Sequence, residues 1–595
     1  MCGIAGSIGH DRQGTFRPAL HAMHDAIAHR GPDDRGTWCS PDRQAAFVHT
    51  RLSIIDPSPA GHQPMAIGGD RFTITYNGEI YNYAALRAEL VTRGVQFRST
   101  SDTEVILRLY EAEGPACVDR LRGMFAFAIW DAQERRCLLA RDRFGIKPLY
   151  YAADRGTLVF ASEIRAVLAA GVSADLDATA AYHYFRSGSV PEPSTLIRGV
   201  RALEAGHYMT WRDGTTEIRR YWDVSFPHSE ATPDAAEVTR DAFIDSVKHH
   251  FVSDVPVGVF LSGGMDSTAI VAMARLLGHA ELRTFSLAFP GSPLDEGPDA
   301  RRTADHFNTT HHEWAVDGAS ARQLFDDFIA AADQPSIDGF NTFTVSRLAR
   351  RHQTKVVLSG LGGDELFGGY PSFSLVPRLA RVAQVAGQAG ALGQSALRMA
   401  EVVGGSRFRR LADLSDAPTT IENAYAVFRG VYTRDEARTL TAHYLGGEAP
   451  IAAETRSDQD DPTAQDTVSR LELTRYMRNQ LLRDADVMSM ASGVEVRVPF
   501  VDSVLFNRVS RIPAHQRLES RKALLRRAVP EIPAWVANRP KRGFVLPIQH
   551  WLDHEWSGTM SALAPPPSVR IDTWYRRWSV LAFEQWLKRV TPRHG

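Results

Sequence analysis

The sequence lacks several features that would mark particular classes of protein. Only four cysteines occur in 595 residues, without the spacing of a paired metal motif and too few for a disulfide scaffold. The 68 basic and 69 acidic side chains leave a net charge of -1, so no global field favours nucleic acid or an anionic membrane. We therefore expect small-molecule substrates, no nucleic-acid partner and a reducing cytoplasm as the location.

Long apolar runs are also missing. The longest, such as residues 124–130, are too short to cross a bilayer, and no basic stretch leads into an apolar one at the N-terminus, as in a secretory signal. We expect no membrane partner. Hydrophobic residues at 44% and charged residues at 23% are typical of a globular protein, and the length predicts two or three domains.

Histidines near the N-terminus do not complete a metal site. His21, His24 and His29 could share part of a helix face, but no cysteine or carboxylate completes a credible zinc ligand set. We interpret them as ordinary helix residues.

The second residue is the first indication of chemistry. Removal of Met1 would leave Cys2 as the N-terminal residue, with a thiol and a free amine on one residue. The thiol is a nucleophile, and the amine, which titrates near pH ~8, is a base that can accept its proton. A cysteine at this position says little by itself, so its role depends on the residues that accompany it.

Roughly the first two hundred residues alternate predicted strands with helices. Residues 71–76 alternate as in a strand and end at Asn77-Gly78, which predicts a turn. Residues 101–104 form a predicted capping box, which begins a helix that ends near Glu113. Further strands are expected at 137–141, 149–151 and 157–161.

The character of the chain changes after Tyr221-Trp222. Residues 223–235 contain two prolines and several polar residues, which predicts an interdomain linker. Short apolar strands then alternate with helices, as in a parallel α/β sheet, whose ligands bind beyond the carboxyl ends of the strands. The segment 378–465 gives no indication of chemistry. The strands are expected at 255–261, 284–289 and 355–359.

Four segments accompany Cys2 in order along the chain: residues 29–33, 51–56, 76–82 and 101–104. Together with Cys2 they resemble the glutaminase domain of the N-terminal-nucleophile amidotransferases, in the asparagine synthetase branch, over residues 2–210. The resemblance implies an αββα sandwich that hydrolyses glutamine through a tetrahedral oxyanion and a thioester. It implies an oxyanion hole from Asn77 and Gly78, a glutamine carboxylate site at Arg51, and an α-ammonium site at Glu79 and Asp102.

Each of these residues also has a purely structural interpretation. Asn77-Gly78 is a common hairpin turn, Asp102 can complement a helix dipole, and Arg51 can form a surface salt bridge. Their joint occurrence behind Cys2 favours the glutaminase interpretation.

A second motif, residues 261–267, follows a predicted strand and leads into a helical pattern over residues 268–275. Backbone N–H groups of such a glycine-rich turn bind phosphate oxygens, and the motif lacks the lysine of the common P-loop. It resembles the pyrophosphate loop of ATP pyrophosphatases, which implies a parallel-sheet α/β domain. A second glycine-rich segment, residues 359–370, contains carboxylates suited to Mg²⁺ bound with phosphates.

The resemblance to asparagine synthetases continues through residues 486–491, 494–502 and 521–526. It implies that Asp266 and Asp364 bind Mg²⁺, and that Lys522 stabilises the charge that builds as ammonia attacks an acyl-adenylate. From composition alone, Lys522 would be a lysine on a helix surface. The residues expected to bind ATP are Leu261, Ser262, Gly263, Gly264, Asp266, Ser267, Leu287, Ser359 and Gly360.

The combined expectation is an ATP-dependent ligase of two domains. Residues 2–215 form the glutaminase, which releases ammonia at Cys2, and residues 236–595 form the ATP-pyrophosphatase domain, which adenylates aspartate. Ammonia passes through the interior and displaces AMP to give asparagine. The expected cofactors are ATP and Mg²⁺. If the protein assembles into an oligomer, we expect a homodimer.

Two departures from enteric-type asparagine synthetases bear on the acceptor. Asp338 lies near the position at which those enzymes are expected to carry an arginine, and Leu361 stands where they carry a glutamate. The alternative acceptor is therefore another carboxylate, such as a uronic acid sugar of a surface polysaccharide or a natural-product acid. An intramolecular cyclase like the β-lactam synthetases is disfavoured by the intact glutaminase residues. A scaffolding protein with a spent synthetase domain is disfavoured by Asp266, Asp364 and Lys522.

Overall fold

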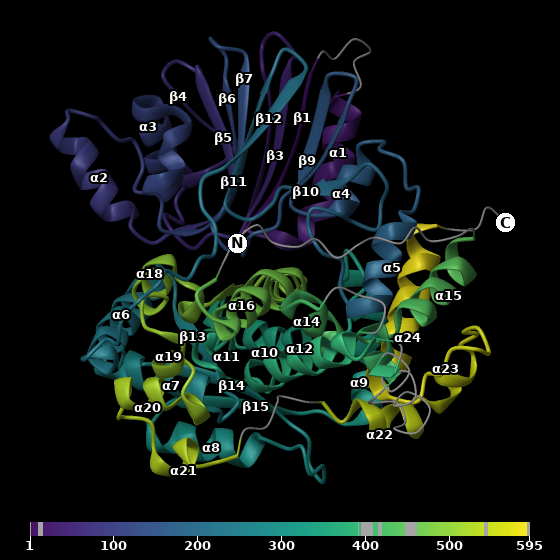
Figure 1. The fold of residues 1–595 in the computed structure, drawn as a ribbon. Helices are drawn as coiled ribbons and strands as arrows, with labels where there is room; N and C mark the ends of the chain where they lie inside the picture. The colour runs from purple at the N-terminus through teal and green to yellow at the C-terminus, as the bar shows by residue number, and fades with distance from the viewer. Residues whose placement is uncertain are drawn as a thin grey trace.

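Two six-stranded antiparallel sheets form the first half of the chain, drawn at the top of Figure 1. The computed structural model describes residues 2–9, 16–390, 392–393, 409–414, 419–446, 461–540 and 546–591. The strand orders are β10-β8-β9-β1-β3-β2 and β12-β11-β7-β6-β5-β4. The strands are β1 Gly3–Ile8, β2 Asp34–Cys39, β3 Ala45–Arg51, β4 Met65–Ile67, β5 Phe72–Ile80, β6 Gly123–Asp131, β7 Arg136–Arg141, β8 Tyr150–Asp154, β9 Thr157–Ala161, β10 Arg201–Ala202, β11 His207–Arg212 and β12 Thr215–Arg220.

The two sheets pack face to face and carry helices on their outer faces. Ile4, Phe47 and Phe160 of the first sheet join Trp130 and Leu139 of the second in one buried cluster. Helices α1 (Phe16–Ile27) and α4 (Ile164–Ala169) cover the first sheet, and α2 (Tyr83–Thr92) and α3 (Asp102–Glu113) cover the second. Helix α5 (Ala178–Ser187) follows α4. The predicted αββα sandwich is confirmed.

The predicted turn at Asn77-Gly78 is wrong. Strand β5 continues to Ile80, and Asn77 and Gly78 pair with Ala126 and Phe125 of β6. A Cβ atom at residue 78 would lie 2.2 Å from the Met124 carbonyl oxygen, so the glycine is required by close approach of the two strands. Nine paired residues between β5 and β6 outweigh the local turn preference of the dipeptide.

The predicted helix start at Ser101 is confirmed, but its capping box is wrong. The Ser101 side chain accepts a hydrogen bond from the Thr103 N–H, which caps α3. The Glu104 carboxylate does not close the box, because it accepts from the N–H groups of Arg98 and Ser99, at 2.9 and 2.7 Å. Glu104 therefore fixes the loop that leads into the helix.

A five-stranded parallel sheet forms the centre of the second half, as predicted. Its order is β15-β14-β13-β16-β17, and every neighbouring pair is parallel. Regular structure is absent over residues 223–234, between β12 and α6. The strands are β13 Val257–Phe260, β14 Arg283–Ala288, β15 Thr310–Ala315, β16 Val356–Leu358 and β17 Glu495–Arg497.

Helices surround this sheet. In the described parts of the chain, none of them is long and apolar enough to span a membrane. A π-helical segment, Glu472–Leu482, joins α16 to α17. The helices are α6 Ala235–His250, α7 Met265–Leu276, α8 Gly297–His306, α9 Gly318–Ala331, α10 Phe340–Arg351, α11 Gly363–Phe367, α12 Ser372–Gln388, α14 Ile421–Arg429, α15 Arg434–Leu445, α16 Ala464–Leu471, α17 Arg483–Met490, α18 Ser503–Val509, α19 Ala514–Arg517, α20 Ala523–Ala528, α21 Ala534–Ala537, α22 Ile548–Asp553, α23 Ser557–Ser561 and α24 Trp574–Val590.

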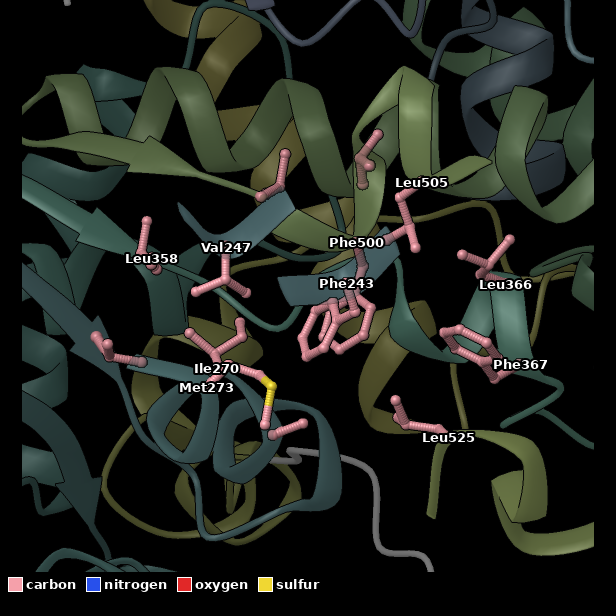
Figure 2. Packing of buried hydrophobic residues seen from close by; sticks show 14 of the residues in the cluster. Phe243, Val247, Ile270, Met273, Leu358, Leu366, Phe367, Phe500, Leu505 and Leu525 are labelled. Carbon is pink, nitrogen blue, oxygen red and sulfur yellow. The ribbon is translucent and has the colours of Figure 1, made fainter. Parts of the chain in front are cut away.

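The core of the second half lies between the sheet and helices α6 and α7. Phe243 of α6 stacks on Phe500, with ring centroids 4.5 Å apart and an interplanar angle of 18°. Figure 2 shows the two side chains together. Ile270 and Met273 of α7 lie to the left of this pair in the figure, and Leu358 of β16 belongs to the same buried cluster. Full burial of each such side chain contributes about 1.5–3 kcal/mol. This packing fixes the strand ends from which the two glycine-rich loops emerge.

Buried charges join the two halves of the chain. The Arg30 guanidinium, fully buried, donates to Glu163 at 2.8 Å and to Asp486 of α17 at 2.7 Å. Arg122 forms a bidentate pair with Asp502 of the second half, at 2.9 and 3.0 Å. A buried pair that loses one partner leaves an uncompensated charge, so these contacts specify one docking geometry.

Candidate active site

The predicted glutaminase residues meet around Cys2. Cys2 immediately precedes β1 and is 8% exposed, and its N–H donates to Asn77 Oδ1 at 3.0 Å. A cavity of about 30 Å³ opens beside it. The predicted residues that line this cavity are Cys2, Arg51, Gly78, Glu79 and Asp102.

The Asn77 amide has the arrangement expected of an oxyanion donor. Its oxygen accepts the hydrogen bond from the Cys2 N–H, so the nitrogen of the same amide points away from that N–H. That nitrogen, Nδ2, is buried and has no hydrogen-bond partner among the described residues. An unsatisfied buried donor costs about 1–3 kcal/mol, a cost that a negatively charged oxygen at this position would remove.

Arg51, at the end of β3, is a buried cation beside the cavity. It is 5% exposed and donates to the carbonyl oxygens of Ser58 and Ile55, at 3.1 and 3.3 Å, and to that of Asp56. The alternative of a surface salt bridge is wrong, because the side chain is buried and these partners are main-chain carbonyls. A cation held by carbonyl dipoles suits a carboxylate ligand.

Asp102 and Cys2 both have raised pKa values. Asp102 Oδ2 accepts from the Tyr76 hydroxyl at 2.8 Å and from the Ile80 N–H at 3.1 Å. Burial raises the pKa of the Asp102 carboxyl, and these hydrogen bonds oppose the change. Burial also raises the pKa of the Cys2 thiol, so attack by its sulfur depends on a base that takes the proton.

One residue of this cavity, Glu495, was not predicted from the sequence. Glu495 lies on β17, in the second half of the chain, and lines the same cavity as Cys2. Residues 494–502, which include Glu495, are part of the resemblance to asparagine synthetases, but the resemblance implied no role for Glu495. Only the docking of the two halves brings Glu495 to Cys2, and no local pattern in the sequence encodes that docking.

The second site is a cavity of about 1300 Å³ at the carboxyl ends of β13, β14 and β16. This is the edge at which parallel sheets bind ligands. The structure brings all the predicted residues of the second site to this one cavity: Leu261, Ser262, Gly263, Gly264, Asp266, Ser267, Leu287, Ser359, Gly360, Asp364 and Lys522.

The first glycine-rich loop turns sharply from β13 into α7. Gly263 has φ 69°, and a Cβ atom there would lie 2.8 Å from the Ala300 nitrogen. The Ser262 and Ser267 hydroxyls lie 3.2 Å apart across the turn. Helix α7 begins at Met265, so its N–H groups and dipole face the cavity that these residues line.

Lys522 lies between the two predicted metal-binding carboxylates. Its Nζ is 2.6 Å from the Asp266 carboxylate and 2.5 Å from the Asp364 carboxylate. Burial would lower the pKa of Lys522, but these two carboxylates raise it. The alternative of a lysine on a helix surface is wrong: Lys522 is buried, and its φ of 51° is a strained, left-handed conformation.

Asp266 and Asp364 also fit a magnesium ion. Both approach one cation closely, and their hard oxygen atoms are ligands that Mg²⁺ prefers. Groups of three or more metal-ligating side chains do not occur in the described part of the chain. Mg²⁺ commonly binds one or two carboxylates and completes its shell with phosphates and water, which this pair permits.

The two departures, Asp338 and Leu361, line this same cavity. Burial and the nearby Asp484 raise the pKa of Asp338 to about 6. Glu365, also on the cavity wall, has its pKa raised to about 7 by burial and by Asp364. This side of the cavity therefore carries acidic groups.

The segment 378–465, where no chemistry was predicted, supplies part of the cavity wall. Arg429 of α14 pairs with Glu472 at 2.6 Å and lies over the rings of Tyr370 and Tyr476, at 4.6 and 3.8 Å from their centroids. Tyr425 lines the cavity beside it. These contacts are tertiary, so the composition of the segment could not reveal them. Residues 391, 394–408, 415–418 and 447–460 lie outside the described residues.

Comparison with known proteins matches both halves of the chain to family models. Residues 1–222 match a glutamine amidotransferase domain, and residues 238–588 match asparagine synthase. The chain is 34% identical to asparagine synthetase [glutamine-hydrolyzing] 1 of Bacillus subtilis over 569 residues, 93% of this chain and 88% of the relative.

Two further relatives are also similar over most of their length. A putative asparagine synthetase [glutamine-hydrolyzing] of Mycobacterium bovis is 36% identical over 584 residues, 92% of this chain and 86% of the relative. Amidase chyE of Penicillium rubens is 27% identical over 622 residues, 93% of this chain and 89% of the relative. The predicted family is confirmed: this chain belongs to the asparagine synthase family and carries a glutamine amidotransferase domain ahead of the synthase domain.

Proposed function

We propose that this enzyme makes asparagine from aspartate, with ATP as the energy source and glutamine as the nitrogen donor. The glutaminase chemistry belongs to residues 2–215 and the ATP chemistry to residues 236–595. The observation that carries the proposal is the Lys522–Asp266–Asp364 cluster, which lies in the cavity that the two glycine-rich loops line. Homodimer formation and a cytoplasmic location stay predictions.

In the first half-reaction, the Cys2 sulfur attacks the glutamine side-chain amide. After loss of Met1, the Cys2 amine accepts the thiol proton, which the raised thiol pKa makes necessary. The free Asn77 Nδ2 and the Gly78 N–H stabilise the tetrahedral oxyanion. Collapse of the intermediate releases ammonia and leaves a thioester on Cys2, which water hydrolyses to glutamate. Arg51 holds the glutamine carboxylate, and Glu79 and Asp102 hold its ammonium.

In the second half-reaction, the acceptor carboxylate attacks the α-phosphate of ATP and pyrophosphate leaves. The Gly263-Gly264 turn and the N-terminus of α7 hold the phosphates, and Leu261, Leu287 and the Ser359-Gly360 backbone frame the adenosine. Asp266 and Asp364 would hold Mg²⁺, which neutralises phosphate charge when bound. The Lys522 ammonium then stabilises the negative charge that develops as ammonia displaces AMP.

The experiment that tests this function measures all products with glutamine, ATP and aspartate. The proposal requires asparagine, glutamate, AMP and pyrophosphate in equal amounts. Release of ADP and phosphate, or AMP formation without asparagine, would contradict it.

The two departures, Asp338 and Leu361, keep open a second candidate, amidation of another carboxylate, because both line the cavity of the second site. ATP–pyrophosphate exchange across a panel of acids, including uronic acid sugars, separates the two candidates. Exchange with aspartate alone supports asparagine synthesis, and exchange only with another acid supports the second candidate.

A further inference from the structure

Arg497 connects the two halves of the chain at the glutamine cavity. It lies on β17 and is fully buried. Its Nη2 donates to Glu79 Oε2 at 2.9 Å, and its Nε donates to Glu495 Oε1 at 2.5 Å. Its Nη1 donates to the carbonyl oxygens of His250 and Val252, at 2.9 and 2.6 Å. Because all three nitrogens are engaged, the guanidinium is held in one position.

The contact with Arg497 fixes the direction of the Glu79 carboxylate. Glu79 Oε2 is taken by Arg497, while Oε1 is buried and has no hydrogen-bond partner among the described residues. Glu79 lines the cavity beside Cys2. A buried carboxylate oxygen beside this cavity is suited to an ammonium ligand, provided that the carboxylate stays ionised.

Arg497 also favours the ionised form of Glu79. Burial raises the pKa of Glu79 well above its ordinary value, and the positive charge of Arg497 is the largest influence that lowers it. Without Arg497, the pKa of Glu79 would rise further, and a neutral carboxyl would bind a cation less well.

The main chain of Arg497 reaches the nucleotide site. Its carbonyl oxygen accepts from the Ser359 N–H at 2.8 Å, at the start of the second glycine-rich loop. In the parallel pairing of β16 with β17, Arg497 lies opposite Leu358. One residue of the second half therefore contacts Glu79 through its side chain and the nucleotide loop through its backbone.

We propose that Arg497 is a positioning residue, supplied by the synthase domain, that orients Glu79 toward the α-ammonium of glutamine in the amidotransferase domain. This inference rests on the proposed glutaminase function and extends it, because the glutamine site is then incomplete without the second domain. The glutaminase reaction alone, without ATP or an acceptor, is a sufficient readout. Failure of aspartate as the acceptor would therefore leave the test intact.

The test compares Arg497→Lys with the wild type in the full chain, by glutamate release. Lysine keeps the charge but cannot hold Glu79, Glu495 and two carbonyls at once. The KM for glutamine should rise about tenfold or more while kcat changes little, because a charged hydrogen bond to the substrate is weakened. Arg122→Lys is the matched control, since Arg122 also spans the two halves through Asp502, and its KM should stay near the wild-type value.

A second substrate separates lost positioning from poor folding of Arg497→Lys. Glutaramate, which is glutamine without the α-amine, cannot use Glu79, so Arg497→Lys and Glu79→Gln should each weaken glutamine use about tenfold and leave glutaramate use unchanged, whereas a folding defect would lower the use of both substrates. In Arg497→Lys, Glu79→Gln should add no further loss, because the two residues act as one unit. A fall in kcat with unchanged KM, an equal effect of Arg122→Lys, or additive effects of the two substitutions would overturn the proposal.

Discussion

The Nζ of Lys522 lies 2.6 Å from both carboxylate oxygens of Asp266, a residue 256 positions earlier in the chain. Asp266 belongs to the first turn of α7, directly after the pyrophosphate-type loop. Lys522 belongs to the short helical turn before α20 (Ala523–Ala528). This contact therefore places a buried cation beside the first glycine-rich loop and the N-terminus of α7.

We predict that Asp266→Ala stops adenylation. Loss of this carboxylate removes an expected Mg²⁺ ligand and a partner of Lys522, while the cavity around Cys2 is unchanged. Pyrophosphate and AMP formation should fall about 100-fold or more, a loss comparable with removal of an electrostatic catalytic group. Glutamate release from glutamine should stay measurable. Asp305→Ala, at an exposed position of α8, is the control, and retained AMP formation in Asp266→Ala would refute the metal role.

We predict that Cys2→Ala abolishes glutamine use but keeps synthesis with added ammonium, because the two sites use separate cavities. Product formation with glutamine and with ammonium chloride gives the measurement. Cys39→Ala, at an exposed cysteine, should behave as wild type in both assays. Loss of the ammonium-dependent reaction in Cys2→Ala would show that the sites are not separable.

Asn77→Ala should lower glutaminase kcat about 10²–10³-fold, or about 3–4 kcal/mol in the barrier, because the Nδ2 donor is lost. The KM for glutamine should change far less, since the oxyanion exists only in the transition state. Steady-state glutamate release measures both constants. An unchanged kcat would show that Nδ2 does not face the reacting carbonyl.

Arg30→Met tests the docking of the two halves. Arg30 is fully buried between Glu163 and Asp486, so its loss leaves Glu163 paired with Arg165 and His29, and Asp486 paired with Lys147. The free energy of unfolding should fall about 3 kcal/mol, the lower end for a broken buried pair, because these partners remain. Arg93→Met, which breaks an exposed pair with Glu89, should cost at most about 1 kcal/mol. Denaturant titration measures both, and equal effects would contradict the structural role of Arg30.

Much of the fold follows from local sequence patterns. The apolar runs at 284–289 and 157–161 appear as β14 and β9, because successive residues of both strands are buried. Asn77-Gly78 misleads because its pairing partner, β6, lies far along the chain. The capping box was predicted wrongly for a similar reason. The Glu104 carboxylate can also reach the N–H groups of Arg98 and Ser99, and it accepts hydrogen bonds from those groups.

The candidate sites were predictable where a short motif carries them. Gly263, Gly264 and Asp266 occur together in one loop, so their spacing is visible in the sequence. Glu495 and Arg429 reach their cavities, and Arg497 reaches Glu79, only through packing between distant segments. Residues of that second kind have no local pattern, and only the folded chain reveals them.

The most direct test of the account uses glutamine labelled with ¹⁵N in its side-chain amide, together with aspartate and ATP. Mass spectrometry should find the label in the side-chain amide of asparagine, with one AMP and one pyrophosphate formed for each. If glutamine and ATP were consumed while aspartate stayed unconverted and no labelled asparagine formed, the result would contradict asparagine synthesis by this enzyme.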